Sequence, residues 1–296
     1  NKKIYMKFIK YFFEFTIIIS LFCIFKIIGL RNASNLGSVL GKLLGPFFRS
    51  KNLIKKNIKI GLGDIDENQE KKIINGMWSN IGRTFAEYVF LKDFKFNKTD
   101  FSNIKIIGSE YLNEIKKSNK SVIFYSAHLA NFELMAMEIE KSGIKTAAIY
   151  RPLNNIFLNP LMEYLRMKYI CPNQIPKGRA GMREIINKIN NNYSIALMVD
   201  QRVGEGPRIN FFNQPAQTTT IPAQLALKYG CKLVPIYLKR MDGASFEMTV
   251  HQPYEISKTG DDDQDTKNIT LKINQIIEKM IVENPEQWLW SHNRWK

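Results

Sequence analysis

Short apolar runs alternate with helix-like segments along the middle and end of this chain. Runs with the length and composition of strands lie at 121–127, 145–150, 194–199, 232–239 and 245–250. Helices are predicted at 67–91, 131–142, 156–168, 180–190, 222–228 and 268–282. Such alternation is typical of an α/β domain, and we expect the last strand to pair antiparallel with its predecessor. The predicted fold class is therefore α/β, a mixed β-sheet flanked by helices.

The most informative motif is His128-Leu-Ala-Asn-Phe-Glu133, where the first strand-like run gives way to a predicted helix. Asn131 is a good N-cap for that helix. This places the His128 imidazole on a strand-to-helix turn and the Glu133 carboxylate in the first helical turn. Such a carboxylate can accept from one ring nitrogen of the histidine and leave the other nitrogen as a base. The simpler alternative is a histidine that caps the helix or hydrogen-bonds inside the core.

The N-terminus is the second informative region. Residues 11–28 are largely apolar and follow several lysines, although Glu14 and Lys26 interrupt the run. About 20 apolar residues are needed to span a bilayer as a helix. We predict that 1–30 form an uncleaved membrane anchor helix, spanning the bilayer or lying in its interface, and that 31–296 form the catalytic domain. The alternative is a buried amphipathic core helix. The basic cluster at 49–59 would suit an anionic membrane surface.

The formal net charge of +16 is high for an ordinary soluble enzyme. Nucleic acid, anionic lipid or another acidic partner could account for it, and so could the codon bias of an AT-rich genome. Cys23, Cys171 and Cys231 lie far apart without CxxC spacing, and the chain has only 3 histidines, so no metal site is expected. The sequence contains no P-loop and no GxGxxG pattern, which gives nucleotide-dependent chemistry little support.

His128 and Glu133 match the H-x4-D/E motif of the lysophospholipid-acyltransferase superfamily, and the wider pattern resembles its lipid A late-acyltransferase branch. The resemblance runs from about Trp78 to the end of the chain. It is carried by the segments 78–88, 126–133, 150–152, 178–181, 196–201, 211–220 and 287–296. Asn213 stands where relatives usually carry Gly, which puts the local turn in doubt. The resemblance implies the same type of α/β fold.

Four further side chains are candidates for substrate binding. Arg151 follows an apolar strand, and Arg179 follows Gly178 at the expected start of a helix. A guanidinium at either place can bind a phosphate, and the resemblance implies a phosphorylated glycolipid acceptor; a surface salt bridge is the alternative. Asp200 ends a strand and could orient Arg151 or a substrate hydroxyl, or simply form a cap or turn. By resemblance, Arg294 in the Trp-rich C-terminal segment is the best candidate for an acceptor contact.

The mechanism predicted from the dyad and the resemblance is direct acyl transfer. His128 is the general base, Glu133 orients it, and Arg151 or backbone amides of the turn at 127–131 stabilise the oxyanion. The resemblance implies acyl carrier protein as the donor, a lipid A precursor as the acceptor and no cofactor. It also places the enzyme at the bacterial inner membrane with its catalytic domain facing the cytoplasm.

Three other interpretations remain open at this point. A related acyltransferase could act on a glycerophospholipid or another glycolipid with the same dyad. A nucleic-acid-binding protein would explain the positive charge and the aromatic residues but not the apolar N-terminus. Nucleic acid is therefore not expected as a partner. A non-catalytic membrane protein would retain only a degenerate dyad.

Overall fold

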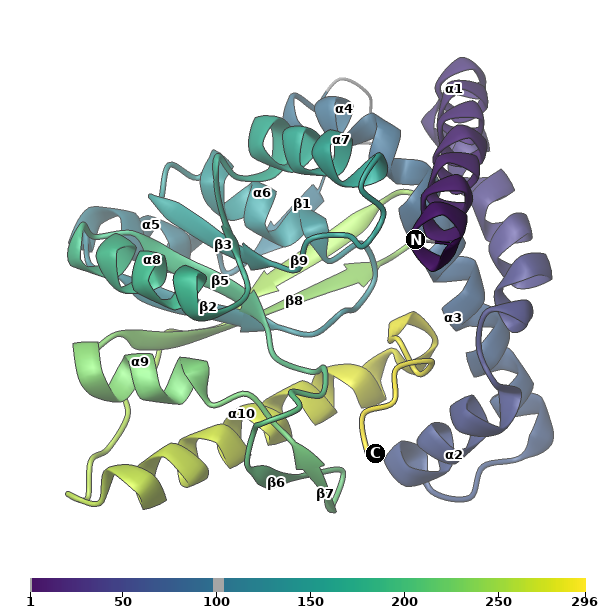
Figure 1. Ribbon diagram of the computed structural model, residues 1–296. Coiled ribbons are helices and arrows are strands. Elements are labelled where there is room, and N and C mark those ends of the chain that lie inside the picture. Colours follow the sequence, from purple (N-terminus) through teal and green to yellow (C-terminus); the bar gives the residue numbers. More distant parts are fainter. Residues whose placement is uncertain (1, 98–103) are drawn as a thin grey trace.

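The computed structural model describes residues 2–97 and 104–296. A seven-stranded sheet lies at its centre, as Figure 1 shows. The strand order is β1-β9-β8-β2-β5-β3-β4, and a separate hairpin is formed by β6 and β7. The strands are β1 Ile104–Ile107, β2 Val122–Ser126, β3 Thr146–Tyr150, β4 Asn173–Pro176, β5 Ser194–Met198, β6 Arg208–Phe211, β7 Gln214–Gln217, β8 Lys232–Arg240 and β9 Phe246–Val250.

The sheet is mixed, as predicted. The strands β8, β2, β5, β3 and β4 are mutually parallel, so their carboxyl ends meet at one edge. The prediction that β9 pairs antiparallel with β8 is confirmed. The central strand β2 is buried at all of its positions, which is expected of a strand covered on both faces.

Helices cover both faces of the sheet. They are α1 Lys2–Leu44, α2 Lys51–Leu62, α3 Glu67–Glu87, α4 Leu91–Lys95, α5 Ser109–Ser118, α6 Glu133–Lys141, α7 Leu158–Leu165, α8 Arg179–Asn190, α9 Ile221–Tyr229 and α10 Asp262–Glu283. Successive residues of β2 point to opposite faces: Phe124 packs in the core with α5, α6 and α7, whereas Ile123 and Tyr125 pack with α8, α9 and α10. Each face therefore has its own apolar core.

The N-terminal helix α1 is broken at Gly29, whose φ of 81° and ψ of 163° are not helical. Residues on both sides of the break reach the end of α3. The ring of Phe22 lies 5.1 Å from that of Phe85, while the Gly37 backbone packs so closely on Gly82 that a Cβ at position 37 would lie 2.4 Å from its carbonyl oxygen. The break lies next to the predicted anchor boundary at residue 30, although helical structure continues to Leu44.

The apolar side chains in the first half of α1 are largely exposed. Within residues 5–47, an 18-residue stretch has a mean hydropathy of 2.2, and 17% of that stretch is buried. By length and composition this helix is therefore able to cross a membrane. The alternative of a buried amphipathic core helix does not agree with this exposure.

Several predicted boundaries differ from the structure. The helix after the His128 motif begins at Glu133, and Asn131 does not cap it: Asn131 is fully buried and its amide donates to Glu87 instead. The helix predicted at 67–91 ends as an α-helix at Glu87 and continues through a 3-10 turn into α4. Strand β4 was not predicted, because only one of its four residues is buried and it has no apolar run.

Asn213 forms an intact turn despite its departure from the family pattern. Phe212 and Asn213 join β6 to β7 with φ values of 52° and 54°. Tight hairpins need positive φ at both central positions, and Asn tolerates this conformation better than most residues.

Candidate active site

His128 and Asp200 meet because their strands are neighbours. Strand β2 ends at Ser126 and β5 at Met198, and these two residues are paired in the sheet. His128 and Asp200 each follow two residues later, so parallel pairing brings them to the same point at the carboxyl edge. The His128 Nδ1 lies 2.7 Å from Asp200 Oδ1, and the His128 backbone N–H donates to Asp200 Oδ2 at 3.0 Å.

Asp200 is an ionised carboxylate held by several donors. It is 3% exposed, and its Oδ2 also accepts from the indole N–H of Trp288 at 2.8 Å. Burial alone would raise its pKa, but the charge and hydrogen bonds of His128 outweigh burial and lower the pKa to about 2. Asp200 therefore carries its negative charge throughout the physiological range.

The same contact makes His128 a stronger base. Burial favours the neutral ring and lowers its pKa, yet the Asp200 carboxylate and, to a lesser degree, Glu133 raise the pKa above its ordinary value. A carboxylate on Nδ1 selects the tautomer with the proton on that nitrogen and leaves the Nε2 lone pair free to accept a proton. The Gln201 side-chain nitrogen lies 3.4 Å from Nε2.

The predicted hydrogen bond between Glu133 and His128 is replaced by a different pairing. The two Glu133 oxygens accept from Arg166 Nε at 3.0 and 3.3 Å, and the Arg166 terminal nitrogen contacts the same carboxylate. The Arg166 guanidinium also lies over the rings of Tyr88 and Tyr150, at 5.9 and 5.7 Å from their centres. Glu133 thus acts on His128 through its charge, while Asp200 orients the ring.

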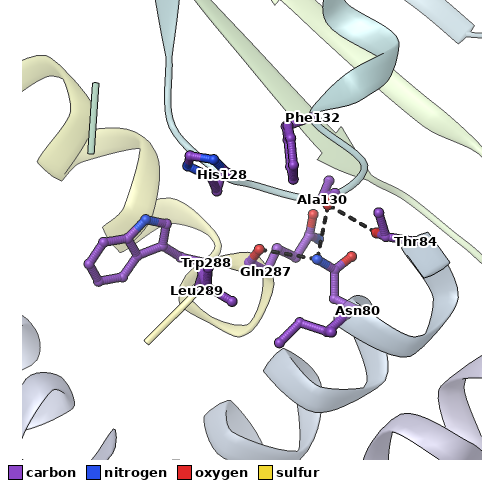
Figure 2. Close-up of a pocket in the computed structure, with 9 residues that line it drawn as sticks. Asn80, Thr84, His128, Ala130, Phe132, Gln287, Trp288 and Leu289 are labelled. Carbon is purple, nitrogen blue, oxygen red and sulfur yellow. Dashed lines mark hydrogen bonds between the residues drawn. The ribbon is translucent and has the colours of Figure 1, made fainter. Parts of the chain in front are cut away.

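The loop after His128 is clamped by two parts of the chain, helix α3 and the C-terminal segment at Gln287. The Ala130 carbonyl accepts from Asn80 and Thr84 of α3 at 3.1 and 3.2 Å (Figure 2). The Ala130 backbone N–H donates to the Gln287 carbonyl at 3.2 Å. These bonds hold Ala130 at a φ of 50°, a left-handed conformation that costs a non-glycine residue about 1–2 kcal/mol. The strain shows that the surrounding structure dictates the path of this loop.

A buried ion pair lies next to the residues that hold Ala130. Glu87 of α3 is fully buried, pairs with Arg240 at the end of β8, and accepts from the Asn131 amide at 3.0 Å. Arg240 in turn donates to Asn80 at 2.9 Å. Hydrogen-bonded polar networks of this kind rigidify a site.

A mostly apolar pocket of about 140 Å³ lies beside the imidazole. Figure 2 shows how the loop, α3 and the C-terminal segment enclose it. Its walls are Asn80, Ile81, Thr84, His128, Ala130, Phe132, Gln287, Trp288 and Leu289. A small apolar pocket at a basic nitrogen can hold reacting groups away from water.

Three backbone N–H groups of the loop already donate hydrogen bonds within the protein. The N–H groups of His128, Leu129 and Ala130 donate to Asp200, Ala127 and Gln287 respectively. The predicted oxyanion contact from the turn at 127–131 therefore has few amides left to supply it.

Arg151 and Arg179 lie further along the same edge of the sheet. Arg151 directly follows β3 and Arg179 opens α8 just after β4, and both are exposed. Lys177 joins them, because its N–H bonds to the carbonyl of Tyr150 at 2.9 Å. Burial, followed by the nearby charge of Arg151, lowers the pKa of Lys177. Neighbouring strands lie about 4.8 Å apart, so this cationic group stands roughly 10–14 Å along the edge from His128.

The side chains of the two other predicted substrate contacts, Asp200 and Arg294, are buried and hydrogen-bond within the protein. Asp200 binds His128 and Trp288 rather than Arg151. Arg294 is fully buried: it donates to the Gln217 carbonyl at 2.7 Å and to Thr218 Oγ1 at 2.8 Å, and burial lowers its pKa to about 10. Arg294 thus ties the C-terminal segment to the end of the β6–β7 hairpin.

Sequence reasoning missed Arg166, Gln201 and the hydrogen bond of Trp288. Arg166 starts a π-helical turn at Arg166–Ile170, inside the region predicted as one regular helix. Such turns are often found at functional sites, but no pattern in the sequence signalled this one. Gln201 could have been identified from the sequence, because it directly follows the candidate residue Asp200.

A histidine hydrogen-bonded to a buried carboxylate, at the carboxyl edge of an α/β sheet, is an arrangement suited to base-assisted group transfer. Sequence comparison specifies the class. The family described as bacterial lipid A biosynthesis acyltransferase matches residues 1–296. The chain belongs to this family and is an O-acyltransferase.

Curated relatives agree with this assignment. The chain is 24% identical to the lipid A biosynthesis lauroyltransferase of Escherichia coli strain K12, over 88% of this chain and 84% of the relative. It is 25% identical to a lipid A biosynthesis acyltransferase of Haemophilus influenzae, over 82% and 76%. It is 23% identical to the lipid A biosynthesis myristoyltransferase of Escherichia coli strain K12, over 87% and 77%.

Proposed function

We propose that the protein transfers a fatty acyl chain from acyl carrier protein to a hydroxyl of a lipid A precursor, with His128 as the general base. The observation that carries the proposal is the His128–Asp200 pair beside the apolar pocket. Family membership supports lipid A chemistry, since the relatives are named for it.

The proposed reaction is a direct transfer. The acceptor hydroxyl attacks the thioester carbonyl as its proton passes to His128 Nε2, which gives a tetrahedral oxyanion and an imidazolium. The oxyanion collapses, the carbon–sulfur bond breaks, and the imidazolium proton goes to the leaving thiolate. Asp200 stabilises the imidazolium that forms between these steps, and Glu133 adds to the same field.

The cationic group at the far end of the edge suits the acceptor. Arg151, Lys177 and Arg179 are exposed. A guanidinium can bind phosphate through two parallel charge-assisted hydrogen bonds, and an ammonium binds it as a point charge. In this proposal they hold a phosphate of the glycolipid and thereby bring a hydroxyl to His128. Arg294 acts indirectly, by holding the C-terminal wall of the pocket.

Two partners follow from charge and hydropathy. The net charge of +16 favours an acidic donor protein such as acyl carrier protein and an anionic membrane surface. The exposed first half of α1 serves as the membrane anchor. Since acyl carrier protein is a cytoplasmic donor, the catalytic domain faces the cytoplasm from the bacterial inner membrane, and no cofactor takes part.

The test is acyl transfer from acyl carrier protein to a Kdo-bearing tetra-acylated lipid A precursor. His128→Ala should lower kcat by roughly 10²–10⁴-fold, the usual contribution of a general base. His251→Ala is the matched control, because His251 is exposed and lies outside this pocket.

Each alternative has its own outcome in this test. Transfer to a lysophospholipid but not to the lipid A precursor would retain the mechanism and replace the acceptor. Wild-type activity in His128→Ala would remove the histidine from the mechanism.

A further inference from the structure

Four large apolar side chains are exposed together where α1 gives way to α2. Leu43, Leu44, Phe47 and Phe48 are 63%, 50%, 85% and 75% exposed. We call these four residues the 43–48 patch. It lies beyond the Gly29 break, at the opposite end of the second half of α1, and is therefore separate from the first half that was predicted as the anchor.

The patch is held rigidly by the residue at its centre. Gly45 is buried against α3, and a Cβ there would lie 2.3 Å from ring atoms of Trp78. The short 3-10 turn Gly45–Phe47 then directs both phenylalanine rings outward. Exposed rings on a rigid turn indicate a surface built to meet an apolar phase.

Positive charge surrounds the patch. Lys42, Arg49, Lys51 and Lys56 are exposed, and among the described residues none of them has a carboxylate within salt-bridge distance. Their neighbours Lys55 and Lys59 are paired, with Glu70 and Asp64. Unpaired cations around exposed apolar rings match an anionic lipid surface, where rings enter the acyl boundary and lysines meet headgroups.

We propose that the 43–48 patch is a second lipid contact, which inserts into an anionic membrane surface independently of the first half of α1. This inference rests on the proposed membrane association of the protein but not on its donor or acceptor.

The two lipid contacts together would orient the catalytic domain. About 15 residues separate Gly29 from the patch, so the second half of α1 spans roughly 22 Å. With lipid contacts at both ends, this half-helix must lie along the membrane instead of standing upright in it. Helix α3 packs alongside it (Figure 1) and supplies Asn80, Ile81 and Thr84 to the pocket. A lipid acceptor would then have a short path from the bilayer to His128.

Environment-sensitive fluorophores on single cysteines of the full chain test this directly. Cys23 in the first half of α1 is exposed, whereas Cys171 and Cys231 are buried. A label on native Cys23 reports on the anchor. In a Cys23→Ser background, a label on Phe48→Cys reports on the patch. In the same background, a label on Asp263→Cys, in the first turn of α10, is the control.

Vesicles containing phosphatidylglycerol should shift the emission of the label at position 48 to shorter wavelength, and nitroxide lipids should quench it. The label at position 263 should stay in water. The triple change Lys42→Gln, Arg49→Gln and Lys51→Gln should raise the lipid concentration needed for the position 48 signal by roughly 10- to 100-fold.

The other outcomes are distinct. A label at 23 in lipid with one at 48 in water would overturn the second contact and keep the anchor. Both labels in water would remove the anchor as well. Shielding of position 48 by acyl carrier protein alone, without vesicles, would make the patch a protein-docking surface and also overturn the proposal.

Discussion

The carboxyl edge of the sheet has two halves that differ in how their polar side chains are satisfied. After β2 and β5, His128 and Asp200 bond to each other, and Asp200 has a further donor in Trp288. After β3 and β4, Arg151 and Arg179 are exposed cations. A group that does chemistry needs its geometry and charge set beforehand, while a group that binds an anionic substrate must remain open until the substrate arrives. Substitutions in each half of the edge test this division.

Asp200→Asn should have the largest effect. An amide cannot stabilise the imidazolium and does not select the reactive tautomer, so kcat should fall by roughly 10²–10⁴-fold. The pKa of His128 should fall too, because the carboxylate is what raises it. Since the neutral ring is the base, wild-type kcat/KM should be lost as pH falls through a pKa above 6.5, and this acidic limb should move to lower pH in Asp200→Asn.

Asp265→Asn is the matched control for that experiment. Asp265, in the first turn of α10, is also a buried carboxylate, 2% exposed, but it accepts from the backbone N–H and the hydroxyl of Thr259. Its replacement should affect thermal stability and leave the pH profile of kcat/KM unchanged. A shift of the acidic limb in both variants would show a general loss of structure and would contradict a specific role for Asp200.

Glu133→Gln should be milder than Asp200→Asn, with a loss of about 10-fold in kcat, because Glu133 acts on His128 only through its charge. Arg166→Gln leaves Glu133 unpaired, and the double variant should lose less than the sum of the two single changes. A double-mutant cycle on kcat measures this coupling. If Glu133→Gln proves as damaging as Asp200→Asn and shows no coupling to Arg166, then Glu133 orients the ring in the reacting complex, as its motif predicts.

Arg151→Ala and Arg179→Ala should raise KM for the phosphorylated acceptor by about 10-fold each, with little change in kcat, because a charge-assisted hydrogen bond is lost in binding. Arg183→Ala on the exposed side of α8 is the control. Assays with an acceptor that lacks the phosphate should abolish the difference between wild type and variants. An effect confined to kcat would instead place these arginines at the oxyanion.

Trp288→Phe should have the smallest effect, a change of a few-fold in kcat. Without the indole N–H the Asp200 carboxylate is less satisfied, so it stabilises the imidazolium more and moves the acidic limb to higher pH. Trp290→Phe is a close control, since Trp290 is equally buried but donates to the Pro285 carbonyl at 2.7 Å. Identical pH profiles for the two variants would show that Trp288 only packs.

Much of the fold was predictable because it depends on local pattern. The five apolar runs that were predicted as strands form β2, β3, β5, β8 and β9, and each predicted helix has a counterpart with boundaries shifted by a few residues. Strand β4 could not be predicted, because an edge strand with one buried residue has no periodic pattern of apolar residues. The break at Gly29 escaped because a single glycine in a helical pattern does not specify a bend.

Local sequence pattern was sufficient to predict that His128 follows a strand, that a carboxylate lies in the first turn of the next helix, and that cations follow later strands. The carboxylate that binds the ring could be identified only from the three-dimensional fold. The order β2-β5-β3 places Asp200, 72 residues away in the chain, at 2.7 Å from His128 Nδ1, while Arg166 takes Glu133. The tertiary structure likewise buried Arg294 and left Arg151 open. Partners of this kind depend on strand order and register, which arise from the packing of the whole chain and leave no trace in local spacing.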